Sequence, residues 1–253
     1  MSITANRLYR DSFNFLRNEL FTIVLLTLFA ALTTVMINHL FLPTQEQLNI
    51  LETTKNQIDA QNIGIKQMIS QMSPEQQMAI LKISACATFS MLLGHVLLIG
   101  GMLSIMIEIS NNRPVRFLKT LSTFLPVLPK LFLLVFICTL LIQLGLTAFI
   151  IPGIIIALSV SFSPIIFINE KVGIFSAISR SSKMAFTHAR LIIPAMLLWW
   201  SAKLLLLLLL LLSINHLNIS SHNMMILIFN ALNYFLLAFL LVYLFRLYML
   251  LRA

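Results

Sequence analysis

Four long stretches without Asp, Glu, Lys or Arg constrain the fold of this chain more than any other feature. They are 20–41, 83–107, 131–169 and, apart from Lys203, 191–245. A helix needs about 20 consecutive apolar residues to cross the hydrocarbon core of a bilayer. These stretches therefore predict an all-α, polytopic integral membrane protein. The charged fraction of 10% argues against a soluble globular domain, where it is about a quarter.

Six transmembrane helices fit into these stretches. We expect one membrane domain, 1–253, with spans at 20–41, 83–109, 131–151, 154–169, 191–212 and 224–245. Pro152 and Gly153 are predicted to form the tight hairpin between the third and fourth spans, because both residues interrupt helices. The segment 42–82 is expected to be an outer helical segment. Within it, Ser73 is followed three residues later by Gln76, which predicts that the second span begins there as a helix.

The distribution of Lys and Arg predicts the orientation. Thirteen of these residues lie in the termini and loops on one side, and only Lys55, Lys66 and Lys82 lie on the other. Lys and Arg are enriched on the cytoplasmic side of membrane proteins. Because six spans return the chain to its starting side, we expect both the N- and C-termini in the cytoplasm.

Basic amphipathic stretches precede the first, third and fifth spans. In the first stretch the apolar face is predicted to contain Tyr9, Phe13, Leu16 and Leu20. Such stretches are typical of interfacial helices, here on the cytoplasmic side, whose basic faces meet lipid phosphates. They suggest three repeats of a surface helix and two spans, although basic inner loops alone also produce this pattern. The candidate lipid-phosphate contacts are Arg7, Arg10, Arg17, Arg116, Lys119, Arg180, Lys183 and Arg190.

Lys203 is the sharpest anomaly because it falls inside the fifth span. A lysine at the centre of a span costs roughly 2.5–3.5 kcal/mol, so it is a functional candidate by default. The structural alternative is a lysine bonded to a carbonyl, to Asn230 or to Gln143. Glu108, at the end of the second span, either pairs with a basic loop residue or acts as a transport carboxylate.

Ser159, Ser163 and Pro164 predict a bend in the fourth span, which is either a packed kink or part of a substrate cavity. The candidate intramembrane polar site therefore comprises Lys203, Glu108, Asn230, Gln143, Ser159 and Ser163.

The sequence predicts no catalytic, cofactor or metal site. Cys86 and Cys138 lie inside apolar runs without a Cys-x-x-Cys partner, and His95 has no ligand type three or four residues away. The net charge of +9 does not indicate nucleic-acid binding, because the basic residues flank apolar runs.

Several motifs resemble those of a known family. They are Met72-Ser73-Pro74-Glu75-Gln76-Gln77, Leu128-Pro129-Lys130-Leu131-Phe132, Pro152-Gly153-Ile154-Ile155 and Tyr243-Leu244-Phe245-Arg246-Leu247-Tyr248. Over essentially its whole length the chain resembles the YciC group of uncharacterised inner-membrane proteins of enteric bacteria. The resemblance implies a multi-pass protein of the bacterial inner membrane, and it supplies no activity.

Three functions fit these observations to different degrees. The leading hypothesis is a non-enzymatic membrane protein that supports the cell envelope by binding phospholipids or another inner-membrane protein. The alternative is a small-molecule transporter or permease that uses a cavity near Lys203. A membrane enzyme comes third, because it would need a nucleophile and base, or a metal cluster, at one interface.

Overall fold

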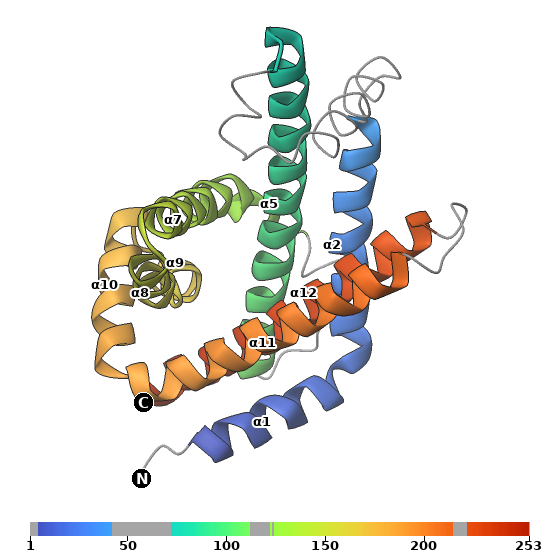
Figure 1. Ribbon diagram of the computed structural model, residues 1–253. Helices are drawn as coiled ribbons and strands as arrows, with labels where there is room; N and C mark the ends of the chain where they lie inside the picture. Colours follow the sequence, from blue (N-terminus) through green and yellow to red (C-terminus); the bar gives the residue numbers. More distant parts are fainter. Residues whose placement is uncertain (1–4, 42–71, 112–121, 123, 215–221, 253) are drawn as a thin grey trace. The chain divides into compact units, whose positions relative to one another are not determined.

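A computed structural model describes residues 5–41, 72–111, 122, 124–214 and 222–252 (Figure 1). They belong to two compact units, one formed by Met1–Leu32 with Gly94–Ala253 and the other by Thr33–Leu93. The two units are described separately. Most of the predicted outer segment 42–82, together with Arg116 and Lys119, lies outside the described residues.

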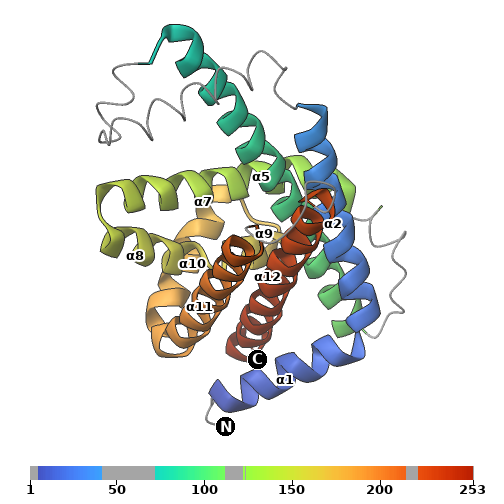
Figure 2. The same cartoon turned by 45° about the vertical axis from the view of Figure 1, so that its right-hand side comes forward.

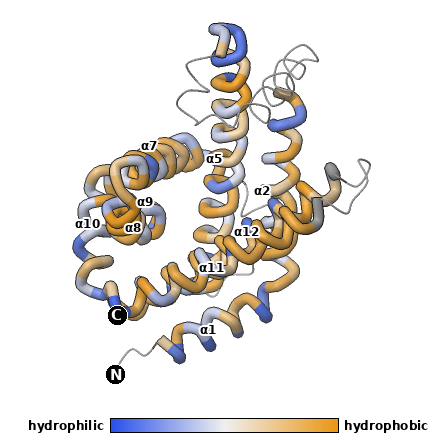
Figure 3. Tube along the Cα trace, viewed as in Figure 1, coloured by the Kyte–Doolittle hydropathy of each residue, from blue (hydrophilic) through white to orange (hydrophobic). Residues whose placement is uncertain are grey.

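The described residues form helices joined by turns, without a strand. Among the described residues, six helical segments are long and apolar enough to cross a membrane, which confirms the predicted number of spans. They are α2 (Leu20–Leu40), α5 (Pro74–Ser110), the short turn η1 (Leu125–Val127) with α7 (Leu128–Ala148), α8 (Ile150–Val160) with α9 (Ser163–Glu170), α11 (Ala189–Ile214) and α12 (His222–Arg252). Figure 3 shows the apolar residues running along α7, α11 and α12.

Polar contacts organise the unit Thr33–Leu93. The Gln76 backbone N–H donates to Ser73 Oγ (3.3 Å), and the Ser73 N–H donates to Gln76 Oε1 (2.8 Å). This reciprocal cap confirms the predicted helix start, so α5 begins at Pro74. Further along α5, the Ser90 hydroxyl bonds to Asn38 Oδ1 of α2.

The turn between the third and fourth spans lies at Phe149, three residues earlier than predicted. Phe149 is extended (φ −160°, ψ 154°) between the end of α7 and the start of α8. Pro152 falls in the first turn of α8, where its missing N–H costs nothing because that position has no helical acceptor. Gly153 permits the close approach of α7 and α8 (Figure 2), since a Cβ there would lie 2.8 Å from the Leu146 backbone nitrogen.

The fourth span is interrupted between α8 and α9, in the region where the sequence predicts a bend. The Phe162 backbone N–H donates to Ser181 Oγ (3.1 Å), and the Ser181 hydroxyl donates to the Ser159 carbonyl oxygen (2.6 Å). The groups freed by the break are therefore satisfied by a serine from another helix rather than by a serine of the same span.

Two helices precede spans without being long enough to cross the membrane. They are α1 (Ala5–Asn18), before α2, and α10 (Ile174–Thr187), before α11. The helix α10 packs on α8 and α9 through the small residues Ala177, Ser181 and Ala185, while Arg180 and Lys183 stay exposed. The exposed Arg180 and Lys183 agree with the basic amphipathic character predicted for the stretch before the fifth span.

The helix α1 packs along α12, and the face it buries agrees with the predicted one only in part, since Leu16 of that face is buried. Leu8 and Phe15 are buried, whereas Phe13 of the predicted face is 62% exposed. The Tyr9 ring lies 4.9 Å from the Tyr243 ring of α12, and burial raises the pKa of the Tyr9 phenol above its ordinary value. The difference arises because α12 covers the apolar side of α1. The periodicity of α1 shows that one side is apolar, but it does not show which element packs there.

Candidate functional site

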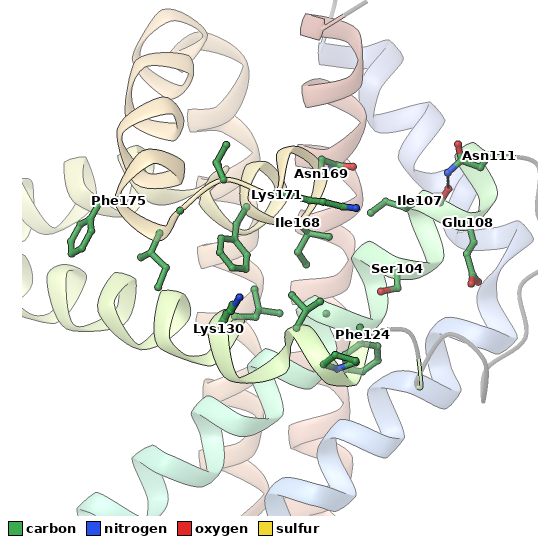
Figure 4. A pocket seen from close by; sticks show the side chains of 18 residues that line it. Ser104, Ile107, Glu108, Asn111, Phe124, Lys130, Ile168, Asn169, Lys171 and Phe175 are labelled. Carbon is green, nitrogen blue, oxygen red and sulfur yellow. Dashed lines mark hydrogen bonds between the residues drawn. The ribbon is translucent and has the colours of Figure 1, made fainter.

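A cavity of about 1140 Å³ lies in the unit formed by Met1–Leu32 and Gly94–Ala253. It is bordered by the end of α5, by η1 and the start of α7, by α9, and by the residues that lead into α10 (Figure 4). Pockets for small ligands and cofactors commonly have volumes of about 300–1,000 Å³. The cavity is therefore large enough for a ligand with a sizeable apolar part.

Apolar side chains form most of the cavity wall. Phe124, Leu131 and Phe167 are buried where they line it, and Phe175 lines it from α10. Gly100 lets this wall pack against the α5 backbone, because a Cβ there would lie 3.0 Å from Phe124 Cδ2 and 3.2 Å from Leu131 Cδ2. The wall thus offers an apolar surface for alkyl chains.

Charged and amide side chains also line the cavity. Lys130 comes from the first turn of α7, Lys171 follows α9, and Glu108 lies near the end of α5. Asn111 and Asn169 contribute amides from α5 and α9. In Figure 4 the Lys171 side chain extends toward the α5 wall, whereas Lys130 rises from α7. Two ammonium groups against one carboxylate favour an anionic ligand.

Lys171 has an unusual backbone conformation. It ends α9 in the left-handed region (φ 51°, ψ 34°), and among the described non-glycine residues it alone has a positive φ. This conformation costs an L-residue roughly 1–2 kcal/mol and is usually left to glycine at helix ends. Backbone strain of this kind concentrates at functional sites. The strained backbone and the positive charge of Lys171 therefore both indicate a binding role for this residue.

A polar network holds the end of α9 next to Lys171. Glu170 forms an ion pair with Arg180 of α10, and the two side chains are 17% and 57% exposed. The Tyr248 hydroxyl of α12 donates to Glu170 Oε1 (3.0 Å), and Arg252 Nη1 donates to the Tyr248 oxygen (3.1 Å). The network connects three helices, α9, α10 and α12, at the edge of the cavity.

Lys130 and Lys171 were not among the predicted site residues, although the sequence contains a signal for them. They bound the charge-free stretch 131–169, which is long enough for two spans. Two antiparallel helices of similar length bring the ends of such a stretch back to the same side of a membrane. The α7–α8–α9 hairpin therefore places both lysines at one cavity.

The six predicted intramembrane polar residues do not meet in this cavity. Glu108 lines it, and the other five are not among its lining residues. Lys203 lies in α11 with its ammonium 4.3 Å from the centroid of the Trp199 ring, one turn earlier. The Asn230 amide donates to the Ile226 carbonyl of its own helix (3.0 Å).

The remaining members of that set have local surroundings. Gln143 is exposed on α7, and the Ser159 hydroxyl donates to the Ile155 carbonyl (2.8 Å). Ser163 is buried at the start of α9, where its hydroxyl lies beside the Cys138 thiol of α7.

The predicted lipid-phosphate contacts are exposed wherever the structure describes them. Exposed positions are Arg7, Arg10 and Arg17 on α1, Arg180 and Lys183 on α10, and Arg190 on α11. Arg180 is paired with Glu170, as described above.

In the described part of the chain, no group of three or more His, Cys, Asp and Glu side chains is placed to hold a metal ion.

The described residues therefore form a polytopic α-helical membrane protein. It has six apolar spans, two amphipathic helices and an amphiphilic cavity at the ends of the spans. The chain belongs to the uncharacterised protein family UPF0259, whose model matches residues 1–250, in agreement with the resemblance to the YciC group. It is 51% identical to UPF0259 membrane proteins of Yersinia pestis (strain Pestoides F) and Yersinia pseudotuberculosis serotype O:1b (strain IP 31758), over 100% of this chain and 97% of each relative. No solved structure matches the chain.

Proposed function

We propose that this protein is a non-enzymatic protein of the bacterial inner membrane that binds an anionic phospholipid, with both termini in the cytoplasm. The observation that carries the proposal is the cavity of about 1140 Å³, in which apolar walls meet Lys130 and Lys171. Alkyl chains gain free energy by leaving water for an apolar surface, and ammonium groups bind phosphate oxygens. An anionic amphiphile matches both parts of the cavity.

The depth of the two lysines supports a lipid ligand. Lys130 lies in the first turn of α7 and Lys171 follows the last residue of α9, so both stand at ends of spans. Lipid phosphates occupy this level of a membrane, and a lysine there keeps its contact with water. The excess of Lys and Arg, thirteen on this side against three on the other, supports placing this end of the spans at the cytoplasmic leaflet, whose anionic lipids attract basic residues.

The proposal is tested by lipid binding to the purified full chain in detergent. A fluorescent phosphatidylglycerol serves as the probe, and phosphatidylcholine serves as the neutral competitor. Each basic residue near an anionic lipid surface contributes about 1 kcal/mol, so Lys130→Gln and Lys171→Gln should each weaken binding about fivefold.

Lys183→Gln is the matched control, because it removes one exposed lysine of α10 that does not line the cavity. It should leave probe binding within twofold of the unaltered protein. Equal affinity of the unaltered protein, Lys130→Gln and Lys171→Gln for the probe would overturn the proposal.

The proposed orientation has a separate test. Reporters that are active on only one side of the inner membrane are fused to each terminus in turn. Cytoplasmic activity at both ends is expected, and activity on opposite sides would contradict the arrangement of six spans with both termini inside.

One observation favours the alternative, a small-molecule permease. The fourth span is broken between α8 and α9, and discontinuous helices are common around the substrate sites of transporters. A permease that uses Lys203 needs water access to that position in α11. Single-cysteine labelling at position 203, in a background with Cys86 and Cys138 replaced by serine, would then succeed from at least one side. Protection from both sides would eliminate this alternative.

A further inference from the structure

A second cavity, of about 420 Å³, adjoins the first near the end of α12. Tyr248 and Arg252 line it from α12. Ile107, Asn111 and Asn169 line both this cavity and the larger one. The two cavities are therefore neighbouring compartments of one cleft, which share a wall built from the ends of α5 and α9.

Each compartment has its own cationic groups. Lys130 and Lys171 line the larger compartment, and Arg252 lines the smaller one. The Tyr248 oxygen accepts a hydrogen bond from Arg252 Nη1 (3.1 Å), which positions the guanidinium. Glu170, which accepts the Tyr248 hydroxyl, is already paired with Arg180. Arg252 also interacts electrostatically with Glu170. Because that carboxylate is paired with Arg180, the Arg252 guanidinium can still meet an anion in the smaller compartment.

The shared wall can bond to a ligand that crosses it. The Asn111 side-chain amide donates to the Ile107 carbonyl (2.9 Å), and the Asn169 amide donates to the Ile165 carbonyl (3.1 Å). An amide nitrogen carries two N–H groups, and each side chain also has a carbonyl oxygen. Within the described residues, one amide N–H and one carbonyl oxygen of each asparagine remain for the ligand.

We propose that the cleft binds a lipid with two phosphate groups, one beside Lys130 and Lys171 and the other beside Arg252. The inference rests on the proposed function and specifies its ligand class. The apolar part of the lipid lies in the larger compartment, against Phe124 and Phe167. The atoms that link the two phosphates cross the wall at the Asn111 and Asn169 amides.

Two kinds of lipid have this chemistry. In one, two phosphodiesters are joined through a glycerol, as in cardiolipin, and in the other the two phosphates form a diphosphate on an isoprenoid chain. The first separates its phosphates and the second joins them directly. Competition with both lipids therefore identifies which spacing the cleft accepts.

The experiment measures competition against the fluorescent phosphatidylglycerol probe on the full chain in detergent. The competitors are phosphatidylglycerol, cardiolipin and a long-chain isoprenyl diphosphate. At least one of the two-phosphate lipids should compete about tenfold better than phosphatidylglycerol, the effect of one additional charge-assisted hydrogen bond. In Arg252→Gln this preference should fall to twofold or less.

Two further variants test whether the preference depends on the positive charge of Arg252 itself. Arg252→Lys keeps the positive charge and should keep most of the preference. Arg190→Gln removes one exposed arginine that does not line the cleft, and it should leave the preference unchanged. Competition among the three lipids on the unaltered protein tests the inference even where a variant fails to fold.

The outcomes distinguish this inference from the proposed function. If all three lipids compete equally while Lys130→Gln and Lys171→Gln still weaken binding, the two-phosphate ligand is wrong and the phospholipid site stands. If Arg252→Gln weakens all three competitors by the same factor, the separate role of the smaller compartment is also wrong. If probe binding is insensitive to both lysines, the proposed function itself fails.

Discussion

Replacing Lys171 by glycine should make the protein more stable and its ligand binding weaker. Lys171 holds a left-handed backbone conformation (φ 51°, ψ 34°), which costs an L-residue roughly 1–2 kcal/mol and costs glycine almost nothing. Glycine loses about 0.5–1 kcal/mol of this advantage, because its unfolded chain has more freedom. The net gain in the free energy of unfolding should be about 0.5–1 kcal/mol, or about 2 °C in apparent Tm for a chain of this size.

The same substitution removes one of the two ammonium groups from the larger cavity. The affinity for the phosphatidylglycerol probe should therefore fall about fivefold. Stability is measured by the tryptophan fluorescence of the detergent-solubilised protein during heating, and binding is measured with the fluorescent lipid. Opposite changes in stability and binding are the signature of a strained residue that is kept for its charge.

Lys171→Gln separates the two effects. It keeps the left-handed backbone and loses the charge, so binding should weaken as in Lys171→Gly while the apparent Tm stays unchanged. The reasoning is refuted if Lys171→Gly lowers the apparent Tm, because the backbone strain would then be absent. It is also refuted if Lys171→Gly binds the lipid as tightly as the unaltered protein.

Three further substitutions test the architecture around the cavity, each by the apparent Tm or by hydrogen exchange in detergent. Ser181→Ala leaves a backbone N–H and a carbonyl unpaired at the break in the fourth span and should cost about 1–3 kcal/mol, so an unchanged Tm would contradict its bridging role. Gly153→Ala places a Cβ against Leu146 Cδ2 and 2.8 Å from the Leu146 backbone nitrogen, and it should cost about 1–3 kcal/mol. Gly173→Ala meets nothing within 4 Å and should cost less, since only its position as the N-cap of α10 disfavours Ala. Ser73→Ala removes the helix cap of α5 and should cost about 1 kcal/mol, visible as faster amide exchange in the first turn alone.

The sequence was sufficient to predict the helices, because their signals are local. Missing charges locate six spans, and the spacing of Ser73 and Gln76 locates the start of α5, as the structure confirms. Pro152 was misleading because proline can open a helix as well as end one. The turn at Phe149 depends on backbone angles for which its residue type gives no signal.

The contacts between helices were harder to predict, because hydropathy shows that a face is apolar without showing what covers it. In a membrane this problem is greater, since lipid and protein are equally apolar. The packing of α1 on α12, with Leu8 buried and Phe13 exposed, was missed for this reason. Ser181 was missed as the partner of the broken span because it lies 19 positions from Phe162. Lys130 and Lys171 were overlooked because each resembles an ordinary flanking charge of a span.

The contact between Tyr248 and Glu170 joins residues 78 positions apart, and this separation has a consequence for biosynthesis. Glu170 ends the fourth span and emerges from the ribosome well before Tyr248, which lies near the end of the sixth. The smaller compartment, which Tyr248 and Arg252 line, is therefore complete only after the sixth span has been translated and α12 has packed against the end of α9.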